Sequence, residues 1–199
     1  MLYGQEYTDY QAKRSHWRKV LRRFYLRHAL KHIAGKTIDF GCGTGELLRL
    51  LPSGSVGLEI NQASVAYCQD QKLAVALYQP EEDGYKFGFL PVNTYRTFVM
   101  VHVLEHLAGA GNIMRCIFAS CDRLGIERIV IVVPGMKGFA GDPTHKTFVN
   151  KQYIQDNGLA FLSGYYLKRE KYFPVNLSWV GKVCKHNEYL IIYEKKQAI

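Results

Sequence analysis

The chain lacks the features that mark several special classes of protein. Its five cysteines are an odd number, with no CxxC pair and no Cys/His spacing suited to zinc, which excludes a disulfide scaffold and a zinc finger. Its longest apolar runs, 98–104 and 129–134, are far shorter than the ~20 residues needed to cross a bilayer. No signal-peptide pattern opens the chain. We therefore expect a cytoplasmic protein with reduced thiols, no membrane span and no metal.

Acidic residues are also scarce, because 17 Asp and Glu stand against 26 Lys and Arg, for a formal net charge of +9. The excess is concentrated in residues 1–36, where nine basic residues minus Glu6 and Asp9 give +7. Such a stripe attracts nucleic acid, anionic lipid or an acidic substrate, or it is only a solvated helix face, the interpretation that we favour. The basic residues are Lys13, Arg14, Arg18, Lys19, Arg22, Arg23, Arg27, Lys31 and Lys36.

Strand-like and helix-like segments alternate along most of the 199 residues, which we interpret as a single domain, 1–199. A periodic stretch at 9–33 predicts a helix with one basic face. After it, the pattern predicts strands at 37–40, 56–60, 74–78, 98–103 and 128–133, with helices at 46–51, 61–72 and 112–123 between them. This order is typical of a doubly wound, mostly parallel α/β sheet.

The remaining segments do not fit that alternation. Residues 80–96 hold two prolines and two glycines without a sustained period, which predicts loop with at most one strand fragment. A helix at 147–157 precedes strands at 165–172 and 188–193, which we expect to pair antiparallel across a loop at 173–187. The predicted sheet therefore ends in an antiparallel strand pair.

A glycine loop follows the first strand, with Gly41, Gly43 and Gly45 where the first βα turn of such a sheet meets its ligand. Fourteen residues after Gly45, Glu59 closes the second strand, where a carboxylate can accept hydrogen bonds from both hydroxyls of a ribose. The loop is GxGxG rather than the GxGxxG of dinucleotide sites, and Glu46 follows it, which is unfavourable beside a pyrophosphate. The pair favours S-adenosylmethionine (SAM) over NAD.

With these motifs the chain resembles the class I SAM-dependent methyltransferases, in particular the small-molecule branch. The resemblance covers nearly the whole chain and rests on four motifs in order. These are Asp39-Phe40-Gly41-Cys42-Gly43-Thr44-Gly45, Gly57-Leu58-Glu59-Ile60-Asn61, His102-Val103-Leu104-Glu105-His106-Leu107 and Asp142-Pro143-Thr144-His145. It implies a Rossmann-like fold, SAM as the cofactor and methyl transfer as the activity.

The resemblance also implies roles in the glycine loop. Asp39 would brace the loop, while Gly41 and Gly43, with Cys42 between them, would lie against the methionine part of SAM. The basic segment 1–34 would be a candidate lid over the pocket, in which Tyr7 and Tyr10 either line the lid or pack as plain aromatic residues.

Further residues along the chain receive roles in the same way. Glu59 would hold the ribose, Ile60 would pack on the adenine, and His102 would line the floor between cofactor and acceptor. For His106 we favour the simpler interpretation that it satisfies the start of a helix. His145 is the candidate catalytic base, because histidine is the side chain best suited to proton transfer at neutral pH, although a loop-bracing role fits it equally well.

Besides the irregular stretch 80–96, which leaves one wall of the pocket unpredicted, two departures from the family leave parts of the pocket undefined. Tyr95-Arg96 stands where the family usually has an Asp near strand four, and the acidic residue after strand three is not uniquely placed. The candidates there are Gln79, Glu81, Glu82 and Asp83.

The methyl acceptor is not named by the sequence. We expect transfer to an O, N or C atom of a small molecule, because the domain has little room for a recognition module. The alternatives are an RNA methyltransferase, a catalytically silent SAM-fold module that binds RNA or protein through residues 13–31, and, less favoured, an NAD-dependent oxidoreductase.

Overall fold

The computed structural model describes residue 4 and residues 24–196. Residues 24–30 are helical, as the periodicity of 9–33 predicts, but the rest of that predicted helix lies outside the described residues. The candidate lid, with Tyr7 and Tyr10, and most of the basic stripe lie outside them too. Among the described residues, no helix combines the length and the apolar composition needed to cross a bilayer.

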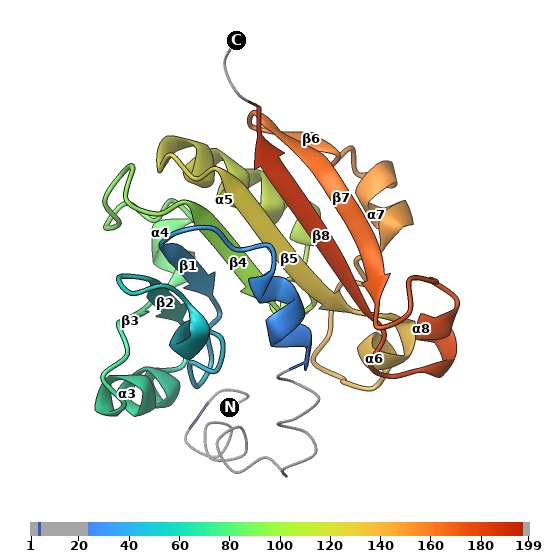
Figure 1. Cartoon of the computed structure of the whole chain (residues 1–199), viewed down its shortest axis with the longest axis horizontal. Helices are drawn as coiled ribbons and strands as arrows, with labels where there is room; N and C mark the ends of the chain where they lie inside the picture. Colours follow the sequence, from blue (N-terminus) through green and yellow to red (C-terminus); the bar gives the residue numbers. More distant parts are fainter. Residues whose placement is uncertain (1–3, 5–23, 197–199) are drawn as a thin grey trace.

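One eight-stranded sheet forms the centre of the molecule, in the order β3-β2-β1-β4-β5-β8-β7-β6 (Figure 1). Neighbours among the first five strands are parallel, whereas β8 runs antiparallel to both β5 and β7. The strands are β1 (Thr37–Phe40), β2 (Val56–Glu59), β3 (Val75–Leu77), β4 (Thr97–Val101), β5 (Arg128–Pro134), β6 (Phe161–Leu162), β7 (Tyr165–Phe173) and β8 (Glu188–Lys195). The predicted doubly wound, mostly parallel fold with an antiparallel C-terminal pair is confirmed.

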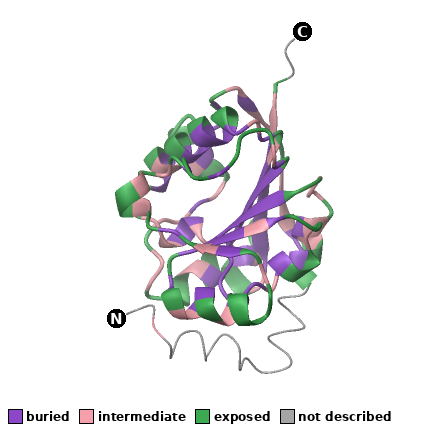
Figure 2. Ribbon diagram, turned by 90° about the vertical axis from the view of Figure 1, so that its left-hand side faces the viewer, coloured by how far each residue is buried: buried purple, intermediate pink, exposed green. Residues whose placement is uncertain are grey.

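Strands β4 and β5 are apolar over 98–101 and 129–134 because both of their faces are covered. In β4, Phe98 and Met100 face one core, while Val99 and Val101 face the other. The first core includes residues of α5 (Ala110–Arg123), and the second includes Tyr25 and Leu26 of the helical segment 24–30. Buried residues accordingly concentrate along the strands (Figure 2).

Shorter helical elements connect the strands. Asn61 caps α3 through its side chain, which accepts a hydrogen bond from the Ala63 N–H, as its position predicts. These elements are η1 (Leu48–Leu50), α3 (Gln62–Asp70), α4 (Pro80–Asp83), η2 (Leu104–His106), α6 (Met136–Ala140), α7 (Lys151–Asp156) and α8 (Val180–Val183).

Four segments differ from the sequence prediction. The helix predicted at 46–51 is only the single 3-10 turn η1, because Pro52 and the turn around Gly54 end it at once. Residues 80–96 contain the short helix α4 and no strand. The predicted helix 147–157 begins only where Asn150 caps α7, and the predicted loop 173–187 contains α8.

The strand order reverses between β1 and β4, which lie side by side although β2 and β3 separate them in the sequence. Because both strands are parallel, the residues after Phe40 and after Val101 emerge at the same edge of the sheet. In open α/β sheets this reversal point is where ligands bind.

Candidate functional site

The glycine loop at the end of β1 is built from close backbone contacts. Gly41 has φ +72°, in the left-handed region that favours glycine, and a Cβ there would lie 2.4 Å from Cγ2 of Val103. Its N–H donates to the Leu58 carbonyl at 2.8 Å, which ties the loop to β2. The loop therefore runs against the segment after β4 with no space for a side chain at position 41.

Glu59, the last residue of β2, is buried and holds this loop from the other side. Its Oε2 accepts a hydrogen bond from the Gly43 N–H at 2.7 Å, and its Oε1 accepts one from the Asn61 N–H at 2.9 Å. Burial raises the pKa of Glu59, although the backbone N–H groups of Asn61, Gly43 and Ile60 act in the opposite direction. A carboxylate has about four acceptor positions, so acceptor capacity remains for a donor from a ligand.

The other residues expected at the cofactor lie around this loop in different environments. Asp39 is buried within β1, two residues before Gly41, where its side chain can brace the start of the loop. The Cys42 side chain is buried in a small apolar cluster with Leu48 and Val65, so it faces the protein interior. Ile60, in contrast, is 48% exposed directly after Glu59. An exposed apolar side chain beside a buried carboxylate is the arrangement that an adenosine moiety needs.

His102 follows β4 and lies between two buried carboxylates. Its Nδ1 is 3.2 Å from Glu105 Oε1, and its Nε2 is 3.5 Å from Glu188 Oε2. The residue has φ +58°, which is uncommon for a side chain other than glycine, and its N–H donates to the Val132 carbonyl at 2.9 Å. Left-handed backbone at a non-glycine residue clusters at functional sites.

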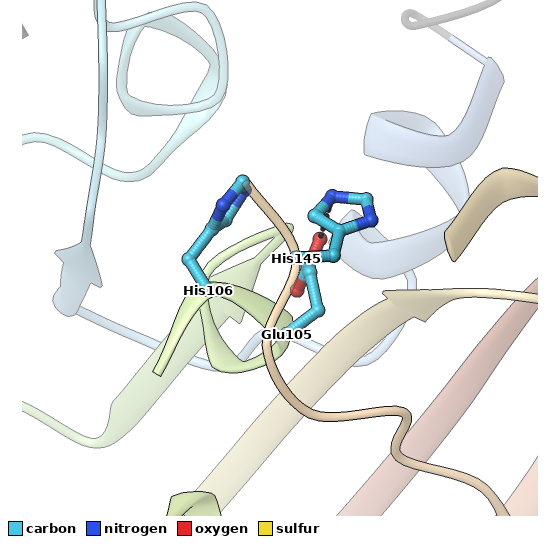
Figure 3. A group of neighbouring side chains, drawn as sticks. All are labelled: Glu105, His106 and His145. Atoms are coloured by element: carbon cyan, nitrogen blue, oxygen red, sulfur yellow. Dashed lines mark ion pairs between the residues drawn. The ribbon is translucent and has the colours of Figure 1, made fainter. Parts of the chain in front are cut away.

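Glu105, His106 and His145 form a second group beside His102 (Figure 3). The carboxylate of Glu105 points toward the imidazole of His145, and its Oε1 lies 3.9 Å from His145 Nε2. The Glu105 carbonyl accepts hydrogen bonds from the Lys146 and Thr147 N–H groups at 2.7 and 3.1 Å. These bonds join η2 to the loop that follows α6, which explains why residues 40 positions apart meet.

Of the two histidines of this group, His106 is held differently from what the sequence suggests, whereas His145 makes a contact that the sequence analysis allows. His106 lies at the end of η2, and its Nδ1 is 3.1 Å from the Thr144 hydroxyl, so the expected role at a helix start is wrong. Burial lowers its pKa, against an opposing effect of Glu105. His145 Nδ1 bonds the Phe139 carbonyl at 2.8 Å, which is the loop-bracing contact; its Nε2 faces Glu105 and Asp142.

Two buried carboxylates of this site were missed by sequence reasoning. Glu105 lies inside the HVLEH motif, three residues after His102, and this spacing could have indicated it. Glu188 had no local signal. It reaches the site because β8 inserts beside β5, which pairs Glu188 with Pro134 at the carboxyl end of β5.

The two departures from the family pattern are resolved in part. Asp83 accepts hydrogen bonds from the Tyr78 hydroxyl at 2.9 Å and the Phe87 N–H at 2.6 Å, so its carboxylate braces residues 78–87. Gln79, Glu81 and Glu82 are exposed. In place of the expected Asp near β4, the segment pairs Arg96 with Glu127 on the surface.

No family model and no curated protein sequence matches the chain. Solved structures do. A SAM-dependent methyltransferase from Archaeoglobus fulgidus matches with a TM-score of 0.68 at 21% identity, covering 94% of this chain and 97% of that chain. A second match is geranyl diphosphate C-methyltransferase from Streptomyces coelicolor A3(2), solved with Mg²⁺, geranyl diphosphate and S-adenosyl-L-homocysteine. Its TM-score is 0.62 at 10% identity, and the match covers 88% of this chain and 79% of that chain. The cyclase SpnF matches with a TM-score of 0.64 at 15% identity, covering 93% of this chain and 84% of that chain.

These similarities establish the fold. The chain has the Rossmann-like fold of class I SAM-dependent methyltransferases, as the sequence motifs imply. Because one similar structure is that of a cyclase, methyl transfer does not follow from the fold alone.

Proposed function

We propose that the protein transfers a methyl group from SAM to a small-molecule acceptor. The observation that carries the proposal is the joint geometry of the Gly41 loop and the buried Glu59 carboxylate at the point where the strand order reverses. SAM supplies a methyl group on a positively charged sulfur, and positioning of the acceptor can supply much of the catalysis.

The residues around the loop fit SAM one part at a time. Gly41 and Gly43 leave the backbone bare where the methionine part would lie, and Asp39 supports them from β1. Glu59 keeps acceptor capacity for a ribose hydroxyl, whose donation would stabilise its ionised form. Ile60 offers an apolar surface to the adenine. Cys42 contributes through its backbone, because its side chain is buried on the opposite side.

The same loop is poorly suited to a dinucleotide. A pyrophosphate requires free N–H groups at the beginning of a long helix. Here the Gly43 N–H is bonded to Glu59, and the loop leads into one 3-10 turn, Leu48–Leu50. The negative charge of Glu59 would also repel a phosphate, whereas it favours a sulfonium cofactor.

We place the methyl acceptor beside the segment that follows β4. His102 and His145 both have ring nitrogens directed at buried carboxylates, so each is suited to contact a polar acceptor. We propose His102 for the floor between cofactor and acceptor, and His145 as the residue on which turnover depends.

Isothermal titration calorimetry of the full chain with SAM, S-adenosylhomocysteine and NAD tests this proposal. The expected result is micromolar binding of SAM and S-adenosylhomocysteine with no heat from NAD. Failure to bind either adenosyl compound would contradict the proposal, as would tighter binding of NAD.

A further inference from the structure

The group of Glu105, His106 and His145 has the composition of a metal site. One ligand-capable atom of each residue lies within 4.8 Å of those of the other two. Around a tetrahedral Zn²⁺, ligand atoms at about 2.1 Å from the metal are roughly 3.4 Å apart, so small side-chain rotations would bring these atoms to ligand distance. Two imidazoles and one carboxylate are a donor set that first-row divalent metals take, with a position left open.

Hydrogen bonds fix which nitrogen of each histidine is available. The Phe139 carbonyl can only accept, so Nδ1 of His145 carries the hydrogen and a neutral ring has its lone pair on Nε2. The Thr144 hydroxyl donates to Asp142 Oδ1 at 2.7 Å, so it accepts from Nδ1–H of His106. The lone pair of His106 is therefore on Nε2 as well. Metal-binding histidines are oriented by just such bonds from their second nitrogen.

The environment of the Glu105 carboxylate also favours a bound cation. Its side chain is 1% exposed, and neither carboxylate oxygen has a hydrogen-bond partner among the described residues. Its Oε1 lies 3.2 Å from His102 Nδ1 and 3.9 Å from His145 Nε2. A buried carboxylate without hydrogen bonds is costly, and a divalent cation would offset that cost.

We infer that Glu105, His106 and His145 bind one divalent first-row transition metal, of which Zn²⁺ is the simplest probe. His145 then acts as a ligand instead of a free base, because one lone pair on Nε2 cannot serve both purposes. The further consequence rests on the proposed function: an open coordination position beside His102 selects an acceptor that offers a hydroxyl oxygen, whose pKa a metal lowers.

Metal binding is tested on the full chain, free of any histidine tag, after treatment with a chelator. Calorimetric titration with Zn²⁺ should give one site. Glu105→Gln and His145→Ala should each weaken it by at least about 10- to 100-fold, and Thr144→Val, which only orients His106, by about 10-fold. His32→Ala, which removes a partly buried imidazole far along the sheet, is the matched control and should bind Zn²⁺ as the unmodified chain does.

Substitution with Co²⁺ identifies the donor atoms. The expected spectrum has visible bands of a nitrogen and oxygen site without thiolate charge-transfer bands, which would instead indicate Cys116 or Cys184. Circular dichroism melting shows that each variant is folded before its Zn²⁺ affinity is compared with that of the unmodified chain. Absence of a Zn²⁺ site in the unmodified chain, unchanged affinity in folded His145→Ala and Glu105→Gln, or thiolate bands would each overturn the inference.

The same samples titrated with SAM separate this inference from the proposed function. Zn²⁺ binding without SAM binding would support the metal site and contradict the function. SAM binding without Zn²⁺ binding would do the reverse.

Discussion

The two sides of the site are built in different ways. The side at β1 and β2 consists of backbone: glycines in left-handed conformation, and N–H groups that donate to one carboxylate, Glu59. The side at β4 consists of ionisable side chains, with His102 and His145 each beside the Glu105 carboxylate. A backbone cradle suits a ligand of constant shape, such as a cofactor. A cluster of ionisable groups suits a ligand whose protons or charge matter, such as an acceptor.

The largest effect on SAM affinity is expected from Gly41→Ala. The added Cβ would lie 2.4 Å from Val103 Cγ2, so the loop must shift away from its present position, and we expect roughly 100-fold weaker SAM binding by calorimetry. Gly84→Ala is the matched control, because Gly84 has φ +62° but open space around it. In Gly84→Ala only the left-handed backbone conformation is unfavourable, which should lower the free energy of unfolding by about 1–2 kcal/mol. Equal SAM affinities for the two variants would contradict a cofactor site at this loop.

Glu59→Gln should weaken SAM binding by about 10- to 100-fold, because hydrogen bonds to a charged group contribute about 1.5–3 kcal/mol. The amide keeps the shape but loses the charge and one acceptor oxygen, which also loosens the bond to the Gly43 N–H. The exposed Asp70→Asn controls for loss of one negative charge. If both variants bind SAM as the unmodified chain does, the ribose is held elsewhere.

A smaller effect is expected from Asn61→Ala. Loss of the cap on α3 should lower the free energy of unfolding by about 1 kcal/mol in a denaturant titration. SAM affinity should stay within about threefold, because Asn61 holds Glu59 through its backbone N–H, which alanine retains. A large loss of SAM binding with little loss of stability would show that the side chain, and not the backbone, serves the cofactor.

The smallest effect on SAM affinity is expected from His145→Ala. His145 bonds the Phe139 carbonyl and faces Glu105 and Asp142, so SAM affinity should stay within about twofold, while turnover with the acceptor is lost. His32→Ala should change neither quantity. A strong loss of SAM binding in His145→Ala would show that the two sides are a single ligand site.

The same difference explains how much could be predicted. Alternating apolar segments, the turn demands of Gly41 and the cap at Asn61 are local signals, so the sheet, the loop and the place of Glu59 follow from the sequence. The neighbours of His145 and of His102 each depend on a contact between distant segments. One is the bond of the Glu105 carbonyl to Lys146 and Thr147, and the other is the insertion of β8 beside β5.

The helices and loops that the sequence analysis predicted wrongly also have physical explanations. The leucines at 47–51 have helical spacing, but Pro52 leaves room for one turn only. In residues 80–96, long-range contacts take the place of a periodic pattern: Tyr78 and Phe87 pack together, and both bond to the Asp83 carboxylate. No local rule indicates such a loop.

A crystal structure of the full chain with S-adenosylhomocysteine tests the division of the site most directly. The account predicts ribose hydroxyls within hydrogen-bond distance of Glu59, adenine against Ile60, and the sulfur directed to the side of His102 and His145. Adenosylhomocysteine bound with its ribose on the histidine cluster, or away from the Gly41 loop, would contradict it.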